Sequence, residues 1–182
     1  MRVPRSPGVD NGSMDLETIK ALAREAHDGQ TDLTGRPYFE AHLTPIAAAA
    51  AVFGPEAEAA GWLHDIVEDT DITADDLVAR GIPSPVVDAV VAVTRRSDES
   101  YAGLIERAAA DPLGVVVKLA DNTWNIICNP ALAEVDEPRA RTMLLDRYLP
   151  ARTRLLAAAE LTEDSPEVVQ MTTILTAALK SL

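Results

Sequence analysis

The sequence predicts an all-α fold in which about 8–10 helices form a single globular domain. Hydrophobic residues make up 47% of the 182 residues, which is enough for a chain of this length to bury one core. Aromatic residues contribute only 4%, whereas alanine is abundant, and this composition favours packed helices over sheets. Apolar residues also recur at helical spacing, and no two segments alternate as paired strands would.

The N-terminal part of the chain begins without periodicity. Residues 1–13 contain two prolines and two glycines, so we expect a disordered leader followed by one domain at 14–182. From Asp15 an apolar stripe at helical spacing predicts the first helix, and Gly29 supplies its stop signal. A further glycine and a proline mark residues 31–39 as a loop.

Proline and capping signals predict the next three helices. Residues 40–53 and 54–69 each carry a proline near the start, where a missing N–H group is tolerated. Thr73 and Asp76 form an N-cap signal for a short helix that Gly81 ends.

The second half of the chain predicts five more helices. Apolar periodicity places them at 84–96, 101–110, 111–128, 137–160 and 165–181. The β-branched run at 115–117 suggests a strand by itself. The apolar pattern around it continues beyond strand length, however, which favours a helix.

The charge of the chain limits its partners. A formal net charge of −13 repels nucleic acid and anionic membranes, so we expect neither as a partner. No apolar run reaches the length of a membrane span, and the N-terminus lacks the apolar segment of a secretory signal. Cys128 is the single cysteine and cannot form an intrachain disulfide, which fits a cytoplasmic location. We expect it to be a small buried apolar residue.

The segment GWLHDIVEDTD, at 61–71, places one histidine and four acidic side chains in an alanine-rich region. On a helix, Glu68 lies one turn after His64. Asp69 likewise lies one turn after Asp65, so these side chains share one flank. A solvated helix end is one interpretation, although acids at a helix C-terminus oppose the helix dipole. A divalent cation would remove that cost, so a metal site is the other interpretation.

A second acidic position follows an apolar run. Asp121 enters this run and shares a helix face with Asn125. A buried carboxylate is costly unless it pairs with a cation or binds a metal, and Lys118 offers the ion-pair alternative. Two imidazoles and two carboxylates suit Mn²⁺, Fe²⁺ or Zn²⁺ better than Ca²⁺. The candidates for such a site are His42, His64, Asp65 and Asp121.

These segments, in this order, resemble the HD-domain hydrolases of the RelA/SpoT homologues. In size the chain is most similar to the small alarmone hydrolases, which include the metazoan SpoT homologue. The similarity covers about residues 21–150, and the strongest signal is LHDIVEDT with KLADNTWN at this separation. The other matching segments are AREAHDGQ, GRPYFEAH, AVVAVTRR and RYLPA.

The resemblance implies a single HD domain with one bound Mn²⁺ and a small-molecule nucleotide substrate. The implied reaction removes the 3′-pyrophosphate of ppGpp or pppGpp, giving GDP or GTP and pyrophosphate. The implied metal ligands are His42, His64, Asp65 and Asp121, and the acidic pair that handles the attacking water is Glu68 and Asp69. The implied substrate-binding residues are Asn125 and Tyr148. Basic side chains should also converge on the phosphates, and the candidates are Arg95, Arg96 and Lys118.

The chain departs from the family pattern in its loop and around its second acidic motif. The family usually has a basic pair near the guanine, where this chain has Asp32 and Leu33. His42 follows Tyr38 by four residues, where the family usually has three. Beside Asp121, an asparagine and a tryptophan stand where the family favours a basic residue and a histidine or tyrosine.

Two other functions stay open. The altered loop favours an HD phosphohydrolase that acts on another nucleotide, such as an adenine alarmone, a nucleoside monophosphate or NADPH. The other alternative is an inactive HD module that binds nucleotide or a partner protein. His27 matches a family motif in AHDGQ, and we expect it to support the site rather than to bind the metal.

Overall fold

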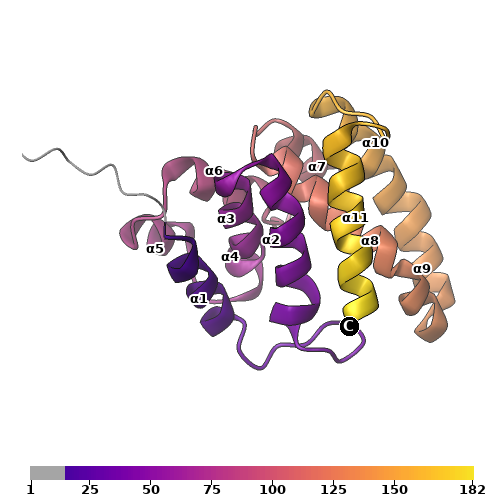
Figure 1. Cartoon of the computed structure of the whole chain (residues 1–182), viewed down its shortest axis with the longest axis horizontal. Helices are drawn as coiled ribbons and strands as arrows, with labels where there is room; N and C mark the ends of the chain where they lie inside the picture. Colours follow the sequence, from indigo (N-terminus) through magenta and orange to yellow (C-terminus); the bar gives the residue numbers. More distant parts are fainter. Residues whose placement is uncertain (1–14) are drawn as a thin grey trace, which may run out of the picture.

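The structure, a computed structural model, describes residues 15–182, and the predicted leader at 1–13 lies outside this range. Within it all regular elements are helical, apart from one isolated bridge between Thr31 and Pro37, and this confirms the all-α prediction (Figure 1). None of the described helices combines the length and apolarity that crossing a bilayer requires.

The helices follow the predicted order closely. The α-helices are α1 (Leu16–Ala26), α2 (Thr44–Ala50), α3 (Pro55–Leu63), α4 (Ile66–Asp69), α5 (Ala74–Ala79), α6 (Ser84–Val93), α7 (Tyr101–Ala109), α8 (Gly114–Val135), α9 (Glu137–Met143), α10 (Leu149–Ala158) and α11 (Pro166–Ser181). Shorter turns are the π-helical η1 (Phe39–Leu43) and η3 (Leu144–Tyr148) and the 3₁₀-helical η2 (Ala51–Phe53). The cap predicted from Thr73 and Asp76 is present as a capping box on α5.

Two apolar clusters form the core. One is built mainly by α1, α3 and α6, and the other by α2, α8, α10 and α11. Helices α2, α3 and α8 contribute side chains to both clusters. In Figure 1, α2 and α11 lie side by side near the middle, and both contact α8. The candidate site residues therefore come from the elements that join the two halves of the core.

The close approach of α2 and α3 explains the small residues where these two helices meet. A Cβ atom added to Gly61 on α3 would lie 2.9 Å from the Ala47 Cα atom and 3.2 Å from the Ala50 Cβ atom. The facing residues are therefore small because larger side chains would push the two helices apart. This packing brings the start of the η1–α2 helix next to the end of α3.

The helix predicted at 54–69 is interrupted in the structure, so the prediction of one continuous helix was wrong. Helix α3 ends at Leu63, and α4 begins after Asp65, whose φ and ψ angles are −102° and −3°. His64 turns inward and is 2% exposed, whereas Glu68 and Asp69 are on the exposed side. The acidic flank of the expected helix is therefore divided into a buried part and a surface part.

The extra residue between Tyr38 and His42 is absorbed by a π-helical turn. In η1 the Thr44 N–H group donates to the Phe39 carbonyl oxygen, five residues back. A π-helical turn holds one residue more than an α-helical turn, and such turns are frequent at functional sites. The departure from the family spacing therefore changes the helix start and leaves His42 facing α3.

We expect Gly61→Ala to destabilise the protein by about 1–3 kcal/mol, because the new methyl group would meet the α2 backbone. The free energy of unfolding from chemical denaturation measures this effect. Gly103→Ala on α7 is the matched control, since its Cβ atom would meet only the side chains of Glu99 and Ser100. That control should be neutral or stabilising by up to about 1 kcal/mol. Equal effects of both variants would contradict the close α2–α3 contact.

Candidate metal centre and adjoining pocket

Three polar side chains meet where η1 faces the break between α3 and α4. The Asp65 Oδ2 atom lies 2.9 Å from His64 Nε2 and 3.2 Å from His42 Nε2. The two imidazole Nε2 atoms are 3.4 Å apart. One donor atom from each residue lies within 4.8 Å of the other two, so the three could hold a metal ion together.

Asp121 on α8 lies at the edge of this cluster. Its Oδ1 atom is 3.8 Å from His42 Nε2 and accepts a hydrogen bond of 2.6 Å from the Asn125 amide. Its Oδ2 atom accepts from the Lys118 ammonium group at 2.7 Å. The structure therefore contains the ion pair with Lys118, while the other carboxylate oxygen still faces the histidines.

The His64 ring is oriented as a metal ligand requires. Its Nδ1 atom lies 2.8 Å from the Gly61 carbonyl oxygen, which can only accept, so Nδ1 carries a hydrogen atom. In the neutral ring this leaves the Nε2 lone pair directed at the cluster. Burial alone would lower the pKa of His64, but the Asp65 and Asp121 carboxylates outweigh burial and raise it to about 9. The donor set thus fits a divalent cation, which would replace the proton.

The pKa values of Asp65 and Asp121 are shifted downward, opposite to that of His64. Burial favours the neutral carboxyl, but His64 and His42 hold the pKa of Asp65 well below its usual range. Burial likewise opposes ionisation of Asp121, and Lys118 with His64 holds its pKa low. Both carboxylates are therefore ionised near neutral pH, as candidate metal ligands must be.

Tyr38 fixes Asp65 from the other side. Its hydroxyl group donates to Asp65 Oδ2 at 2.5 Å, and burial and the Asp65 charge raise the pKa of Tyr38 above its usual value. Its ring stacks on that of His42, with centroids 4.7 Å apart. Apolar periodicity gives no signal for this role, although the PYFEAH motif places Tyr38 one turn before His42.

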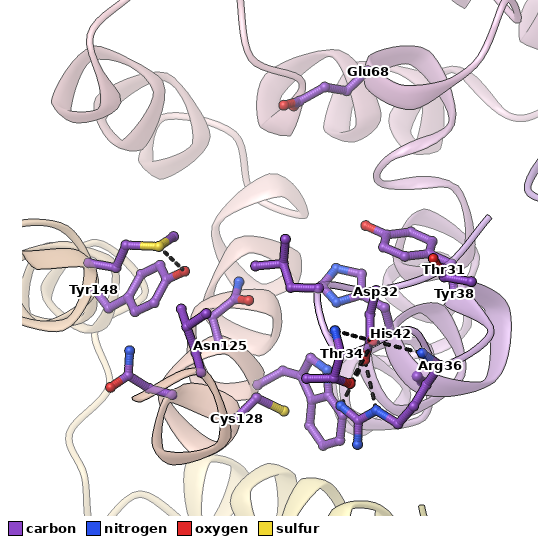
Figure 2. Close-up of a pocket in the computed structure, with 16 residues that line it drawn as sticks. Thr31, Asp32, Thr34, Arg36, Tyr38, His42, Glu68, Asn125, Cys128 and Tyr148 are labelled. Atoms are coloured by element: carbon purple, nitrogen blue, oxygen red, sulfur yellow. Dashed lines mark hydrogen bonds and ion pairs between the residues drawn. The ribbon is translucent and has the colours of Figure 1, made fainter. Parts of the chain in front are cut away.

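Glu68 and Asp69 lie on α4, beyond the cluster. The Glu68 carboxylate accepts a hydrogen bond of 2.8 Å from the Arg95 backbone N–H group. Figure 2 shows it set apart from His42, at the side of a pocket that both residues line. Burial, and then the charges of Asp65 and Glu68, raise the pKa of Asp69.

The pocket beside the cluster has a volume of about 460 Å³. Figure 2 shows Asn125 and Tyr148 on one side of it and the loop residues Asp32, Thr34 and Arg36 on the other. Other lining residues are His42, Trp124 and Cys128. Cys128 is thus only partly buried, contrary to the prediction. Arg95 and Arg96 do not line the pocket and are exposed after α6.

The loop at 31–36 is closed by an internal ion pair. The Asp32 Oδ1 atom accepts hydrogen bonds from the Thr34 N–H and hydroxyl groups and from the Arg36 N–H group. Its Oδ2 atom accepts from Arg36 Nε and Nη2, both at 2.8 Å. Arg36 is the only lysine or arginine among the described residues that line the pocket. The spacing of Asp32 and Arg36 around Gly35 was the only sequence signal for this pair.

The chain is similar to curated proteins that act on guanosine nucleotides. It is 31% identical to a guanosine-3′,5′-bis(diphosphate) 3′-pyrophosphohydrolase of Vibrio cholerae, over 77% of this chain and 21% of that protein. It is 31% identical to a probable chloroplastic GTP diphosphokinase of Arabidopsis thaliana, over 78% of this chain and 22% of that protein. It is 29% identical to the bifunctional (p)ppGpp synthase/hydrolase SpoT of Escherichia coli, over 77% of this chain and 22% of that protein. The chain thus spans about a fifth of the length of these relatives.

A solved structure matches almost the full length of the chain. This is a metazoan orthologue of SpoT that is described as hydrolysing ppGpp, with a TM-score of 0.64, 20% identity and 98% coverage of both chains. The similarity shows a shared fold. No protein-family model matches the chain. Together the relatives and this structure confirm the resemblance predicted from the sequence motifs.

We expect a divalent cation to displace a proton from His64 when it binds to the metal-free protein. Because the pKa of His64 is raised to about 9, protons compete with the cation below that pH. Affinity for the cation should therefore rise with pH up to about 9 and then level off. Titration calorimetry in buffers of different ionisation enthalpy measures the released proton.

The matched control for this titration is Asp71→Asn, which removes a nearby acid outside the cluster and should leave proton release unchanged. An affinity that does not change between neutral pH and pH 9, or binding without proton release, would contradict His64 as a ligand.

Proposed function

We propose that this chain, a homologue of the RelA/SpoT-type ppGpp 3′-pyrophosphohydrolases, removes the 3′-pyrophosphate of ppGpp or pppGpp. The products would be GDP or GTP and pyrophosphate, and residues 14–182 would form the catalytic domain. The observation that carries the proposal is the meeting of His42, His64 and Asp65 beside a pocket of nucleotide size.

His42, His64 and Asp65, with Asp121 as the fourth residue, are the proposed ligands of one divalent ion. Their imidazole and carboxylate donors suit Mn²⁺, with Fe²⁺ or Zn²⁺ as alternatives. The chemistry supplied by such an ion is a lowered pKa of water and compensation of phosphate charge. Tyr38 supports this set because its hydroxyl group holds the Asp65 carboxylate in place.

Glu68 and Asp69 are the proposed proton-handling residues. Glu68 lines the pocket, and the Arg95 N–H group holds its carboxylate at the pocket side. A carboxylate in this position can orient and deprotonate an attacking water molecule. Asp69 keeps its proton to higher pH than an ordinary aspartate, which suits a residue that assists Glu68 or returns a proton.

Nucleotide recognition is assigned to the pocket walls. Asn125 bonds to Asp121 and lines the pocket, so it links the cluster to the bound phosphates. Tyr148 lines the same wall. On the opposite wall, the Asp32 carboxylate holds the Arg36 guanidinium group, whose planar face suits stacking on a purine. Arg95 and Arg96 remain candidates for the outer phosphates only, since they stand outside this pocket.

The loop favours one second candidate, an HD phosphohydrolase of another nucleotide. The Asp32 carboxylate bonds to loop partners, and the Leu33 side chain is 64% exposed. Neither residue carries a positive charge, so neither offers a cationic contact to a base. Among the described residues of this wall, Arg36 alone carries a positive charge that could contact a base. Turnover of a panel of nucleotides would measure which base it prefers.

The first test is hydrolysis of ppGpp by metal-stripped protein with and without Mn²⁺, with GDP and pyrophosphate as the measured products. We expect turnover only with Mn²⁺. Asp65→Ala and Asp121→Ala should lose metal binding and turnover together, because both remove ligand oxygens. Glu68→Ala should lose turnover by at least about 100-fold and keep the metal.

The outcomes separate the candidate functions. Turnover retained in all three variants would contradict the proposed site. Bound Mn²⁺ without ppGpp turnover would reject the alarmone and direct the test to adenine alarmones, nucleoside monophosphates and NADPH. Absence of both metal binding and turnover would favour the inactive module.

We expect Arg36→Ala to raise KM for the nucleotide by roughly 10-fold with little change in kcat, because a stacking contact is lost far from the reacting phosphate. Arg36→Lys should not restore KM, since an ammonium group lacks the planar face. Arg24→Ala, which removes an exposed arginine paired with Glu40 outside the pocket, is the control. A drop in kcat with unchanged KM would contradict a role in base binding.

A further inference from the structure

The guanidinium group of Arg107, on α7, donates all of its N–H hydrogens to the end of α6 and to the segment that follows it. Its Nη1 atom donates to the carbonyl oxygens of Val91 and Ala92, and its Nη2 atom donates to that of Thr94 at 2.7 Å. The Nε and Nη2 atoms both donate to the Glu99 carboxylate. The Arg107 side chain is only 19% exposed, and these bonds fix the orientation of its guanidinium group.

Capping of α6 explains part of this arrangement. Helix α6 ends at Val93, and the last carbonyl groups of a helix lack partners within it. Arg107 provides donors for such groups, and its positive charge suits the negative end of the helix dipole. The bond to the Thr94 carbonyl oxygen has a further consequence, because this oxygen belongs to the peptide group that joins Thr94 to Arg95.

This peptide group connects Arg107 to Glu68. On one side its carbonyl oxygen accepts the hydrogen bond from Arg107. On the other side its N–H group, that of Arg95, donates to Glu68 Oε2 at 2.8 Å. A trans peptide group is planar and its C=O and N–H bonds point in opposite directions, so a fixed C=O bond also fixes the N–H bond. A hydrogen bond to the carbonyl oxygen also polarises the peptide group, which strengthens the N–H group as a donor.

The Glu68 carboxylate depends on this N–H group for its orientation. Glu68 is exposed on α4, and a long exposed side chain has several rotamers open to it. Among the described residues, no other group donates a hydrogen bond to this carboxylate. A general base must lie within hydrogen-bond reach of the water molecule that it deprotonates. Loss of the fixed rotamer would therefore lower the rate without removing any group that binds the substrate.

We propose that Arg107 is a positioning residue for Glu68: through the peptide group between Thr94 and Arg95, it holds the Glu68 carboxylate at the side of the pocket. Arg107 is not among the described residues that line this pocket, so it acts without touching the substrate. Glu99 supports the arrangement because its carboxylate holds the guanidinium group in place. This assignment deepens the proposed function and rests on it for the catalytic role of Glu68.

The kinetic test is a double-mutant cycle that removes Arg107 with and without the Arg95 N–H group. Arg95→Pro deletes that N–H group, and the Thr94 backbone already has the extended conformation that precedes a proline, with φ −70° and ψ 127°. Arg95→Ala loses the same side chain but keeps the N–H group, so it is the matched background. In the Arg95→Ala background, we expect Arg107→Gln to lower kcat for ppGpp by about 10- to 100-fold. KM and Mn²⁺ affinity should stay within about twofold.

In the Arg95→Pro background, kcat should already be low, and Arg107→Gln should change it by less than about twofold. Arg154→Ala is the control, since it removes an exposed arginine that pairs with Glu106 on α7 and should leave kcat unchanged. Melting temperatures are measured alongside, and each rate is taken where the variant is folded. An equal loss of kcat in both backgrounds would overturn the proposal, because Arg107 would then act only as a cap of α6. Unchanged kcat in the Arg95→Ala background would overturn it as well.

A second measurement uses the metal-free protein and does not depend on turnover. The NMR signal of the Arg95 amide proton should lie downfield, as expected for a donor to a carboxylate, and Glu68→Gln should move it upfield. Arg107→Gln should move it in the same direction, and Arg154→Ala should leave it unchanged. A signal that responds to Glu68→Gln but ignores Arg107→Gln would overturn the link. If the signal responds to both and the wild-type protein does not hydrolyse ppGpp, the proposed function fails while the positioning contact stands.

Discussion

The contact of the Asp65 carboxylate with two imidazoles is the interaction on which the rest of the site depends. A carboxylate that is largely enclosed, as Asp65 is at 16% side-chain exposure, is costly unless positive charge or hydrogen-bond donors surround it. His42, His64 and the Tyr38 hydroxyl group supply them at 2.5–3.2 Å. Each of these groups needs its own support: His64 from the Gly61 carbonyl oxygen and Tyr38 from the ring of His27. The groups around the site are thus arranged outward from the Asp65 carboxylate.

Irregular backbone turns the site side chains in directions that a regular helix would not allow. A continuous helix through 54–69 would put His64 and Glu68 on one flank, whereas the break after Leu63 sends His64 inward and leaves Glu68 at the pocket. The π-helical turn η1 then adjusts His42 toward the break. The α2–α3 contact beside them is tightly packed through small residues such as Gly61, and this packing offsets the free-energy cost of the irregular backbone.

Much of this was accessible from the sequence, because helix ranges follow apolar periodicity and capping signals that act over a few residues. The candidate ligands followed from residue type and motif spacing, and the structure brings His42, His64 and Asp65 together. The break at 64–65 was not accessible, since the local pattern suits a continuous helix. The bond from Arg95 to Glu68 and the pair of Asp32 with Arg36 depend on tertiary placement and loop closure, which periodicity does not encode.

The electrostatics of the cluster would let a chain with net charge −13 accept the proposed polyphosphate substrate. Without a cation, Asp65 and Asp121 are balanced by a proton on His64 and by Lys118, so the cluster holds no excess positive charge. If these residues held a divalent cation in place of that proton, one positive charge would be exchanged for two at the wall of the pocket. Since Arg36 is already paired with Asp32, this exchange would be the main local source of net positive charge. Phosphate binding should therefore be coupled to metal binding, and the acidic surface elsewhere would discourage anions that cannot reach the cluster.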